Sequence, residues 1–125
     1  MRIRTVLLPA ISLALVATAC GGDDDSTTPP PLGEVDATVE VLAEDISFPE
    51  DVYETTAGRI GFVYENVGSI RHTLVIEGIS DFKLNVNKNG RVDQAAIDLE
   101  PGTYTLFCDI PGHRAAGMVA DLVVS

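Results

Sequence analysis

The stretch Thr103-Tyr-Thr-Leu-Phe-Cys-Asp-Ile-Pro-Gly-His-Arg-Ala-Ala-Gly-Met118 is the most informative part of this 125-residue chain. It places a thiol, an imidazole and a thioether, on Cys108, His113 and Met118, within one short segment. A soft thiolate combined with imidazole and thioether ligands suits copper better than any hard cation. Two histidines and a cysteine with a weak axial methionine form the ligand set of a blue-copper electron-transfer site. The chain has one other histidine, His72, which is therefore the candidate for the second imidazole.

Strand periodicity indicates that these four side chains can meet, because alternate residues of a strand share one face. Three of the candidate ligands, His72, Cys108 and Met118, are each in phase with an apolar row of their strand and lie at a strand end, and His113, in the middle of the loop, closes the site. The rows are His72, Leu74 and Ile76; Tyr104, Leu106 and Cys108; and Met118, Ala120, Leu122 and Val124. A hairpin-like return puts Cys108 and Met118 at one end of the fold. His72 can lie at the same end if its strand runs antiparallel to 103–108.

The remaining segments predict an all-β domain, because short β-branched and apolar runs alternate with turn signals about every ten residues. Strands are expected at 38–42, 45–49, 52–55, 59–66, 72–77, 103–108 and 118–124. Residues 92–99 are compatible with a strand or with one helical turn, and 78–90 have a less regular pattern. This pattern is typical of an antiparallel sandwich or barrel.

The composition excludes some classes of partner. The chain carries a net charge of −11, and removing residues 1–19 takes away Arg2 and Arg4, which leaves −13. Nucleic acids and anionic lipid surfaces both require a basic patch, so neither is an expected electrostatic partner. The acidity fits a protein kept soluble by charge, or one with a partner that has a basic docking face.

The first 19 residues have the pattern of an export signal. A basic start is followed by an apolar run of 14 residues, 6–19, which is shorter than the ~20 residues of a membrane-spanning helix. The run ends in Ala17-Thr-Ala-Cys20, which resembles the lipobox of bacterial lipoproteins, although Ala17 stands where Leu is usual. That resemblance implies lipidation of Cys20 and a cell-membrane anchor facing the periplasm or the exterior. The alternative is ordinary cleavage after Ala19, which leaves a free thiol.

Residues 20–36 are expected to form a tether and 37–125 the folded domain. The tether contains Gly21-Gly-Asp-Asp-Asp25 and three consecutive prolines, and it has almost no apolar content. Such a composition is typical of a solvated spacer, flexible at Gly and Ser and stiffer through Pro. A calcium site at the aspartates is the less favoured interpretation, because no further ligand pattern follows them.

Residues 37–125 resemble the cupredoxins, the small blue-copper proteins of the plastocyanin and azurin type. The resemblance is carried by an early histidine strand and by Phe107-Cys108-Asp-Ile-Pro-Gly-His113-Arg-Ala-Ala-Gly-Met118, with the spacing Cys-x4-His-x4-Met. This Cys-to-His gap is longer than in plastocyanins and is similar to that in auracyanin and rusticyanin. The resemblance implies a Greek-key β-sandwich or barrel of about seven to eight strands.

The resemblance also implies roles for individual residues. His72, Cys108 and His113 would be strong copper ligands and Met118 the weak axial one. Thr73 stands where the family often has an Asn that ties two loops together, and its hydroxyl could do a similar job. The protein would carry single electrons through one Cu(II)/Cu(I) ion and would not be an enzyme. A monomer that meets its redox partners transiently is expected, with an apolar docking patch at Ile110, Pro111, Ala115 and Ala116.

Three alternatives remain open. A copper carrier without an electron-transfer role would share the ligands but require an exchangeable site. A detached domain of a copper oxidase or nitrite reductase would require more histidines than the two present. A Cys/His hydrolase would require a substrate cleft and a third group that orients the histidine, and Asp109 is not placed for that role.

Overall fold

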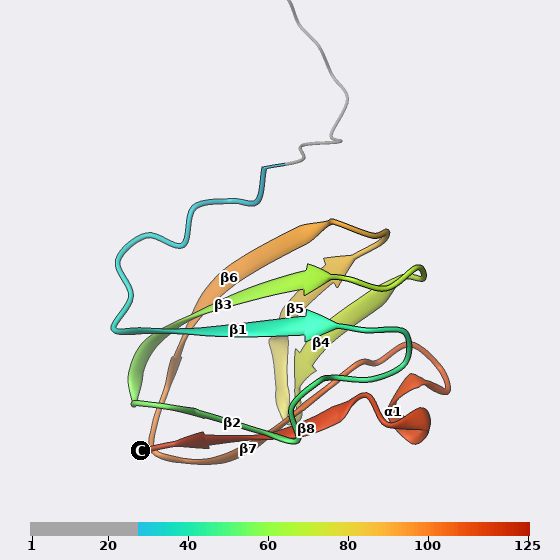
Figure 1. Ribbon diagram of the computed structural model, residues 1–125. Coiled ribbons are helices and arrows are strands. Elements are labelled where there is room, and N and C mark those ends of the chain that lie inside the picture. The colour runs from blue at the N-terminus through green and yellow to red at the C-terminus, as the bar shows by residue number, and fades with distance from the viewer. Residues whose placement is uncertain (1–27) are drawn as a thin grey trace, which may run out of the picture.

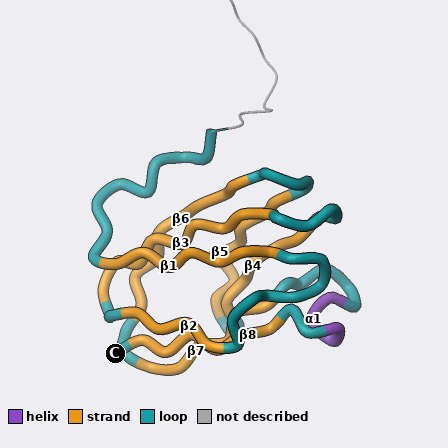
Figure 2. Tube along the Cα trace, in the orientation of Figure 1, coloured by secondary structure: helices purple, strands orange, loops and turns teal. Residues whose placement is uncertain are grey.

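Residues 28–125 are described by a computed structural model, and they form eight strands in two sheets with one helical turn. The three-stranded sheet has the order β1 (Ala37–Ala43), β3 (Gly58–Asn66), β6 (Val92–Leu99). The five-stranded sheet has the order β2 (Val52–Thr55), β8 (Val119–Val124), β7 (Gly102–Phe107), β4 (His72–Ile76), β5 (Ile79–Val86). The single helical turn is α1 (His113–Ala116), at one end of the molecule (Figures 1 and 2). The predicted all-β class with about eight strands is confirmed.

The core lies between the two sheets and follows the predicted alternation. In β3 the side chains of Ile60, Phe62 and Tyr64 are fully buried. In β8 the even positions from Ala120 to Val124 are buried, whereas Val119 is 37% exposed and Asp121 is exposed. Burying one apolar row fixes the register of β3 and β8, because a shift of one residue would expose the whole row. The alternation therefore also fixes which side chains at the ends of these strands point inward. In β4, by contrast, all five residues are buried.

Three details of the predicted strands are wrong or incomplete. Residues 45–49 form no strand; they make one isolated bridge between Glu44 and Ser47, and Ile46 has a φ of 62°. That left-handed conformation and Pro49 both interrupt strand pairing. The segment with the less regular pattern contains β5, and residues 92–99 are the strand β6.

Strand direction also differs from the fully antiparallel expectation. The pairs β1–β3 and β2–β8 are parallel, and the other strand pairs are antiparallel. The reason lies in the connections: β1 and β3 are not joined by a hairpin, because the chain crosses to β2 in the other sheet between them. Only a tight hairpin forces two neighbouring strands to run in opposite directions.

The end of the predicted tether lies on the domain. The side chains of Leu32 and Val35 cover Gly61 in β3, where an added Cβ would lie 2.8 Å from Leu32 Cδ1. The carboxylate of Asp36 accepts a 2.8 Å hydrogen bond from the backbone N–H of Arg59, at the start of β3. We call residues 30–36 the strap. Its contacts begin upstream of residue 37, where the folded domain was expected to start.

Candidate metal centre

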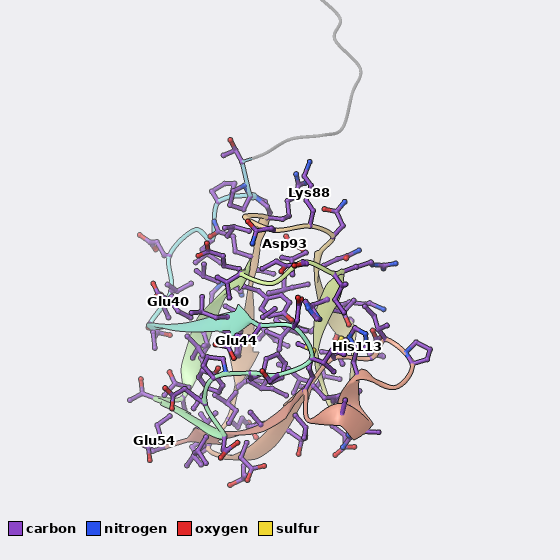
Figure 3. All side chains as sticks on the ribbon, turned by 45° about the vertical axis from the view of Figure 1, so that its right-hand side comes forward. Glu40, Glu44, Glu54, Lys88, Asp93 and His113 are labelled. Carbon is purple, nitrogen blue, oxygen red and sulfur yellow. The ribbon has the colours of Figure 1, made fainter. Side chains whose placement is uncertain are left out.

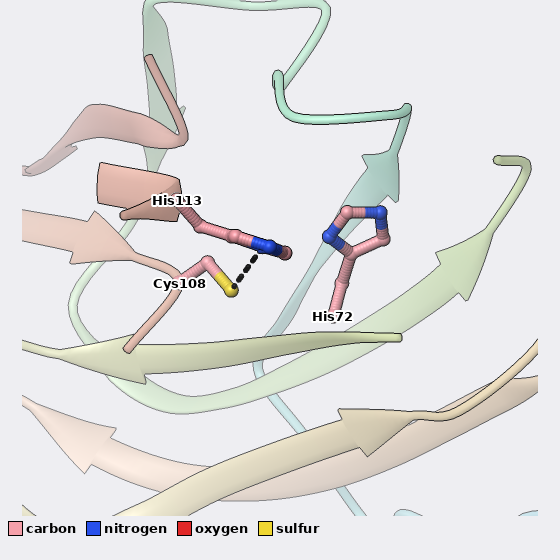
Figure 4. Close-up of side chains that lie close together, drawn as sticks. All are labelled: His72, Cys108 and His113. Carbon is pink, nitrogen blue, oxygen red and sulfur yellow. Dashed lines mark hydrogen bonds between the residues drawn. The ribbon is translucent and has the colours of Figure 1, made fainter. Parts of the chain in front are cut away.

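Three of the four predicted ligands come together at one end of the fold. The ligand atoms of His72, Cys108 and His113 all lie within 4.8 Å of one another. Cys108 Sγ is 3.5 Å from His113 Nδ1, and the two imidazole rings have centroids 5.2 Å apart (Figure 4). His72 and Cys108 are fully buried, whereas His113 is half-buried. One imidazole therefore lies inside the protein and the other reaches the surface.

Strand direction explains this meeting. His72 is the first residue of β4 and Cys108 directly follows β7, and the two strands are antiparallel. The start of one strand and the end of the other therefore lie at the same edge of the sheet, which confirms the expected antiparallel relation. The turn into β8 brings Met118 to this edge as well, since β7 and β8 are antiparallel.

Backbone hydrogen bonds shape residues 108–118, which we call the ligand loop. The N–H of Cys108 donates to the carbonyl of Met118 at 3.1 Å, and the N–H of Met118 donates to the carbonyl of His113 at 3.0 Å. Gly112 and Gly117 flank α1 with φ angles of 86° and 124°, conformations that side chains disfavour. Met118 is fully buried. The loop is thus held mainly by bonds within itself.

The sulfur of Cys108 faces Thr73 in β4. The backbone N–H and the hydroxyl oxygen of Thr73 both lie 3.4 Å from Sγ. The hydroxyl donates its single proton to Asp109 Oδ1 at 2.6 Å and accepts a bond from the Asp109 N–H at 3.0 Å. The backbone N–H is therefore the donor left for the sulfur. Thr73 thus links β4 to the start of the ligand loop.

Asp109 does not orient either histidine. Its carboxylate binds the hydroxyl of Thr73 and, at 2.7 Å, the ammonium of Lys83. Partial burial would raise the pKa of Asp109, but the hydrogen bonds from Lys83 and Thr73 outweigh this and lower it. An Asp109 carboxylate bonded to Thr73 and Lys83 does not provide the third group of a Cys/His hydrolase.

His72 is a buried imidazole whose ring nitrogens have no close hydrogen-bond partner among the described residues. Burial lowers the pKa of His72, since desolvation disfavours the imidazolium; nearby His113 acts in the same direction, and Asp45 opposes it. A neutral imidazole with an unsatisfied nitrogen beside a thiol and a second imidazole fits copper, given the chemistry of these donors.

Two residues behind His72 were not predicted. Oδ1 of Asp45 lies 3.5 Å from His72 Nε2 and accepts hydrogen bonds from the N–H groups of Ser69 at 2.7 Å and Ile70 at 3.3 Å. The buried side chain of Asn66 donates to the carbonyls of Ile70 and Val86 and accepts from the N–H of Gly68. The sequence Asn66-Val-Gly68 is a turn signal that could have indicated Asn66. Asp45 has no comparable signal.

The predicted docking residues are neighbours of His113 in the ligand loop. Pro111, Ala115 and Ala116 are exposed, whereas Ile110 is half-buried and packs against the core. Further exposed apolar side chains are those of Ile46, Val67 and Ile70, in the loops before β2 and β4. Figure 3 shows Glu40 on β1 and Glu54 on β2, both away from His113.

Two further predictions concern export and membrane attachment. Cys20 and the export signal lie outside the described residues. Within residues 28–125, no helix is long and apolar enough to cross a membrane.

Comparisons with known proteins agree with this geometry. Residues 46–125 match the family described as copper binding proteins, plastocyanin/azurin family, and this span contains all four predicted ligands. No curated protein sequence matches the chain.

Solved structures share the fold. Dithionite-reduced auracyanin from the photosynthetic bacterium Roseiflexus castenholzii is 18% identical, with a TM-score of 0.63 over 74% of this chain and 99% of that one. Auracyanin B is 20% identical, with a TM-score of 0.65 over 74% of this chain and 91% of that one. At these identities the likeness supports the arrangement of strands, and the site depends on the residues described above.

Proposed function

Because the chain belongs to the plastocyanin/azurin family of copper-binding proteins, we propose that it is a type 1 copper protein that carries single electrons between redox partners. Copper is the cofactor. The observation that supports electron transfer is the convergence of the thiol of Cys108 with one buried and one surface imidazole. When bound, copper supplies a Cu(II)/Cu(I) couple in this site.

The four ligands have different tasks in this proposal. His72, Cys108 and His113 would hold the ion as its strong ligands, and Met118 would be the weak one. The buried positions of His72, Cys108 and Met118 keep water from three sides of the site. Hydrogen bonds within the ligand loop and pairing of β4 with β7 hold the donors in one geometry. A fixed geometry that suits both oxidation states reduces the rearrangement that accompanies each electron.

A copper spectrum tests this proposal. Purified chain with added Cu(II) should show an intense blue thiolate-to-copper band and narrow copper hyperfine splitting in EPR. The variant Cys108→Ser should lose the band, since a hydroxyl cannot provide the thiolate transition. The variant Thr103→Ser, at the far end of β7, is the matched control and should keep it. A pale spectrum from the unmodified chain would rule out Cys108 as a ligand and, with it, the proposed function.

A copper carrier is the second candidate, and burial of the ligands argues against it. His72, Cys108 and Met118 have no measurable exposure, so a chelator can approach only on the side of His113. We expect copper to transfer slowly to an excess of chelator, over a time much longer than mixing. Rapid and complete transfer would favour a carrier.

Electron exchange is proposed to occur through the exposed edge of His113. The surrounding patch of Ile110, Pro111, Ala115 and Ala116 carries no charge. Redox encounters typically use small, weak interfaces, and a small apolar patch allows a partner to approach closely without tight binding. The partner is a redox protein that binds transiently, and the protein itself acts as a monomer.

The location of the protein is a further part of the proposal. Lipidation at Cys20 would anchor the chain at a cell membrane, facing the periplasm or the exterior. The support is the export pattern of residues 1–19 and the small residues before the cysteine. In the source cells, the variant Cys20→Ala should move from the membrane fraction to the soluble fraction and lose incorporation of labelled fatty acid. An unchanged distribution would remove the anchor from the proposal.

A further inference from the structure

The loop between β1 and β2 brings a carboxylate to the far side of His72 from the ligand loop. Asp45 Oδ1 lies 3.5 Å from His72 Nε2, whose side chain is fully buried, whereas that of Asp45 is 46% exposed. The nitrogen that faces Asp45 is Nε2, so Nδ1 is the one directed at Cys108 and His113, as Figure 4 shows. The imidazole therefore lies between the carboxylate and the other ligands.

The surrounding backbone holds this carboxylate in place. The same Oδ1 accepts the N–H groups of Ser69 and Ile70, the two residues that stand just before Arg71 and His72. Asp45 also fits tightly against Gly68, since a Cβ there would lie 2.8 Å from Asp45 Cγ and 2.9 Å from its backbone nitrogen. A side chain at position 68 would thus displace Asp45. The carboxylate is positioned by contacts that do not depend on a metal.

The position of Asp45 determines what faces the ring proton of His72 when a metal is bound. When Nδ1 of a neutral imidazole binds a metal, Nε2 carries the ring proton. That N–H then points at Asp45, and the 3.5 Å separation allows an electrostatic attraction at the outer limit of a hydrogen bond. A fixed negative charge behind a ligand favours the ion of higher charge, because the attraction grows with the charge on the metal.

We propose that Asp45 is a positioning residue of the copper site, which fixes the orientation of the His72 ring and lowers the reduction potential by favouring Cu(II). This inference rests on the proposed function. It adds a carboxylate, contributed by the crossover between the two sheets, to a site whose ligands all come from β4 and from the ligand loop before β8.

The test compares Asp45→Asn with Asp36→Asn. Asparagine at 45 keeps an oxygen for the Ser69 and Ile70 N–H groups but removes the charge. Asp36 also accepts a backbone N–H, from Arg59, and its replacement changes the net charge equally. It directly precedes β1 and contacts the start of β3, away from the copper end. We expect Asp45→Asn to keep the blue band while its Cu(II) affinity falls about tenfold relative to Cu(I). This corresponds to a rise of about 59 mV in reduction potential.

Asp36→Asn should leave the potential unchanged. Equal potentials for Asp45→Asn and the unmodified protein, or equal shifts in both variants, would overturn the inference. The absence of a blue band in the unmodified protein is a different result, since it contradicts the proposed function.

A second measurement remains decisive if Asp45→Asn does not fold. In the unmodified protein loaded with diamagnetic Cu(I) or Zn(II), the Nε2 proton of His72 should show a nuclear Overhauser effect to the amide proton of Ser69. The two protons share the acceptor Asp45 Oδ1, so they must lie close together. A ring proton on Nδ1, or an Nε2 proton without this contact, would overturn the inference.

Discussion

The two imidazoles of the site are held in different ways. His113 is half-buried in the ligand loop, and its neighbours in the sequence hold it through bonds such as its own N–H to the carbonyl of Ile110. His72 is fully buried, and residues from separate parts of the chain, Asp45 and the segment 66–70, lie behind it. We call Asp45, Asn66, Gly68, Ser69 and Ile70 the bracing cluster. In the proposed function, the loop serves contact with partners, whereas the bracing cluster holds His72 rigid.

The largest effect is expected from removing the centre of the bracing cluster. The change Asn66→Ala eliminates three side-chain hydrogen bonds and leaves the carbonyl of Val86 without this donor in a buried position. It should lower the free energy of unfolding of the copper-free protein by about 3 kcal/mol. Urea unfolding measures this, and Asn85→Ala, at an exposed residue with one side-chain bond to Arg71, is the matched control. Equal losses in the two variants would contradict a special role for the cluster.

A change in the ligand loop should alter partner contact without altering stability. Ala116→Lys places an ammonium beside His113, and desolvating it on contact weakens the encounter by ~1–3 kcal/mol. Electron self-exchange, measured by NMR line broadening in mixed oxidation states, should slow about tenfold or more. Position 116 is preferred over 110, because Ile110 also packs against the core.

The control for this experiment is Thr103→Lys, which changes the net charge equally on an exposed residue at the far end of β7. It should leave self-exchange nearly unchanged. If both lysines slow the exchange equally, the effect is one of overall charge, and the docking patch is misplaced.

The smallest expected effect is a pH dependence of stability that arises from His72. Burial lowers its pKa below the ordinary value of 6.5, so the folded copper-free protein binds a proton there less readily than the unfolded chain. This contribution to stability is complete above pH 6.5 and is lost as the pH falls through the lowered pKa. Melting temperatures of the copper-free protein should therefore fall from pH 7 to pH 5 more in the unmodified chain than in His72→Gln. Parallel curves would mean that His72 is not the titrating group.

The same contrast explains what the sequence could predict. The ligand loop could be predicted from the sequence because it holds Cys108, His113 and Met118 within eleven residues. The alternation of buried and exposed residues in β7 and β8 fixes which way the side chains at its two ends point. His72 was found because it is the one remaining histidine and is in phase with Leu74 and Ile76. Most strand positions could also be predicted, because the alternation of apolar and polar residues depends only on local burial.

The parts that were missed depend on tertiary contacts. Residues 45–49 contain strand-forming Ile46 and Phe48, yet tertiary structure holds Ile46 at a positive φ and directs Asp45 to the amides before His72. No local pattern encodes a partner more than twenty residues away. Parallel pairing of β1 with β3 was missed for the same reason, because the crossover through β2 is a property of the whole fold.

The strap determines where a pulling force on the N-terminal side of the chain would act on the domain. A pull on the N-terminal side would act first on Leu32 at Gly61, on the bond from Gln94 to the carbonyl of Pro30, and on Asp36 at Arg59. All three contacts belong to the three-stranded sheet, whereas the four ligands belong to the other sheet and its loop. Tension applied at the N-terminal side would therefore detach the strap before it reached the metal centre, so the positions of the four candidate ligands would be insulated from that load.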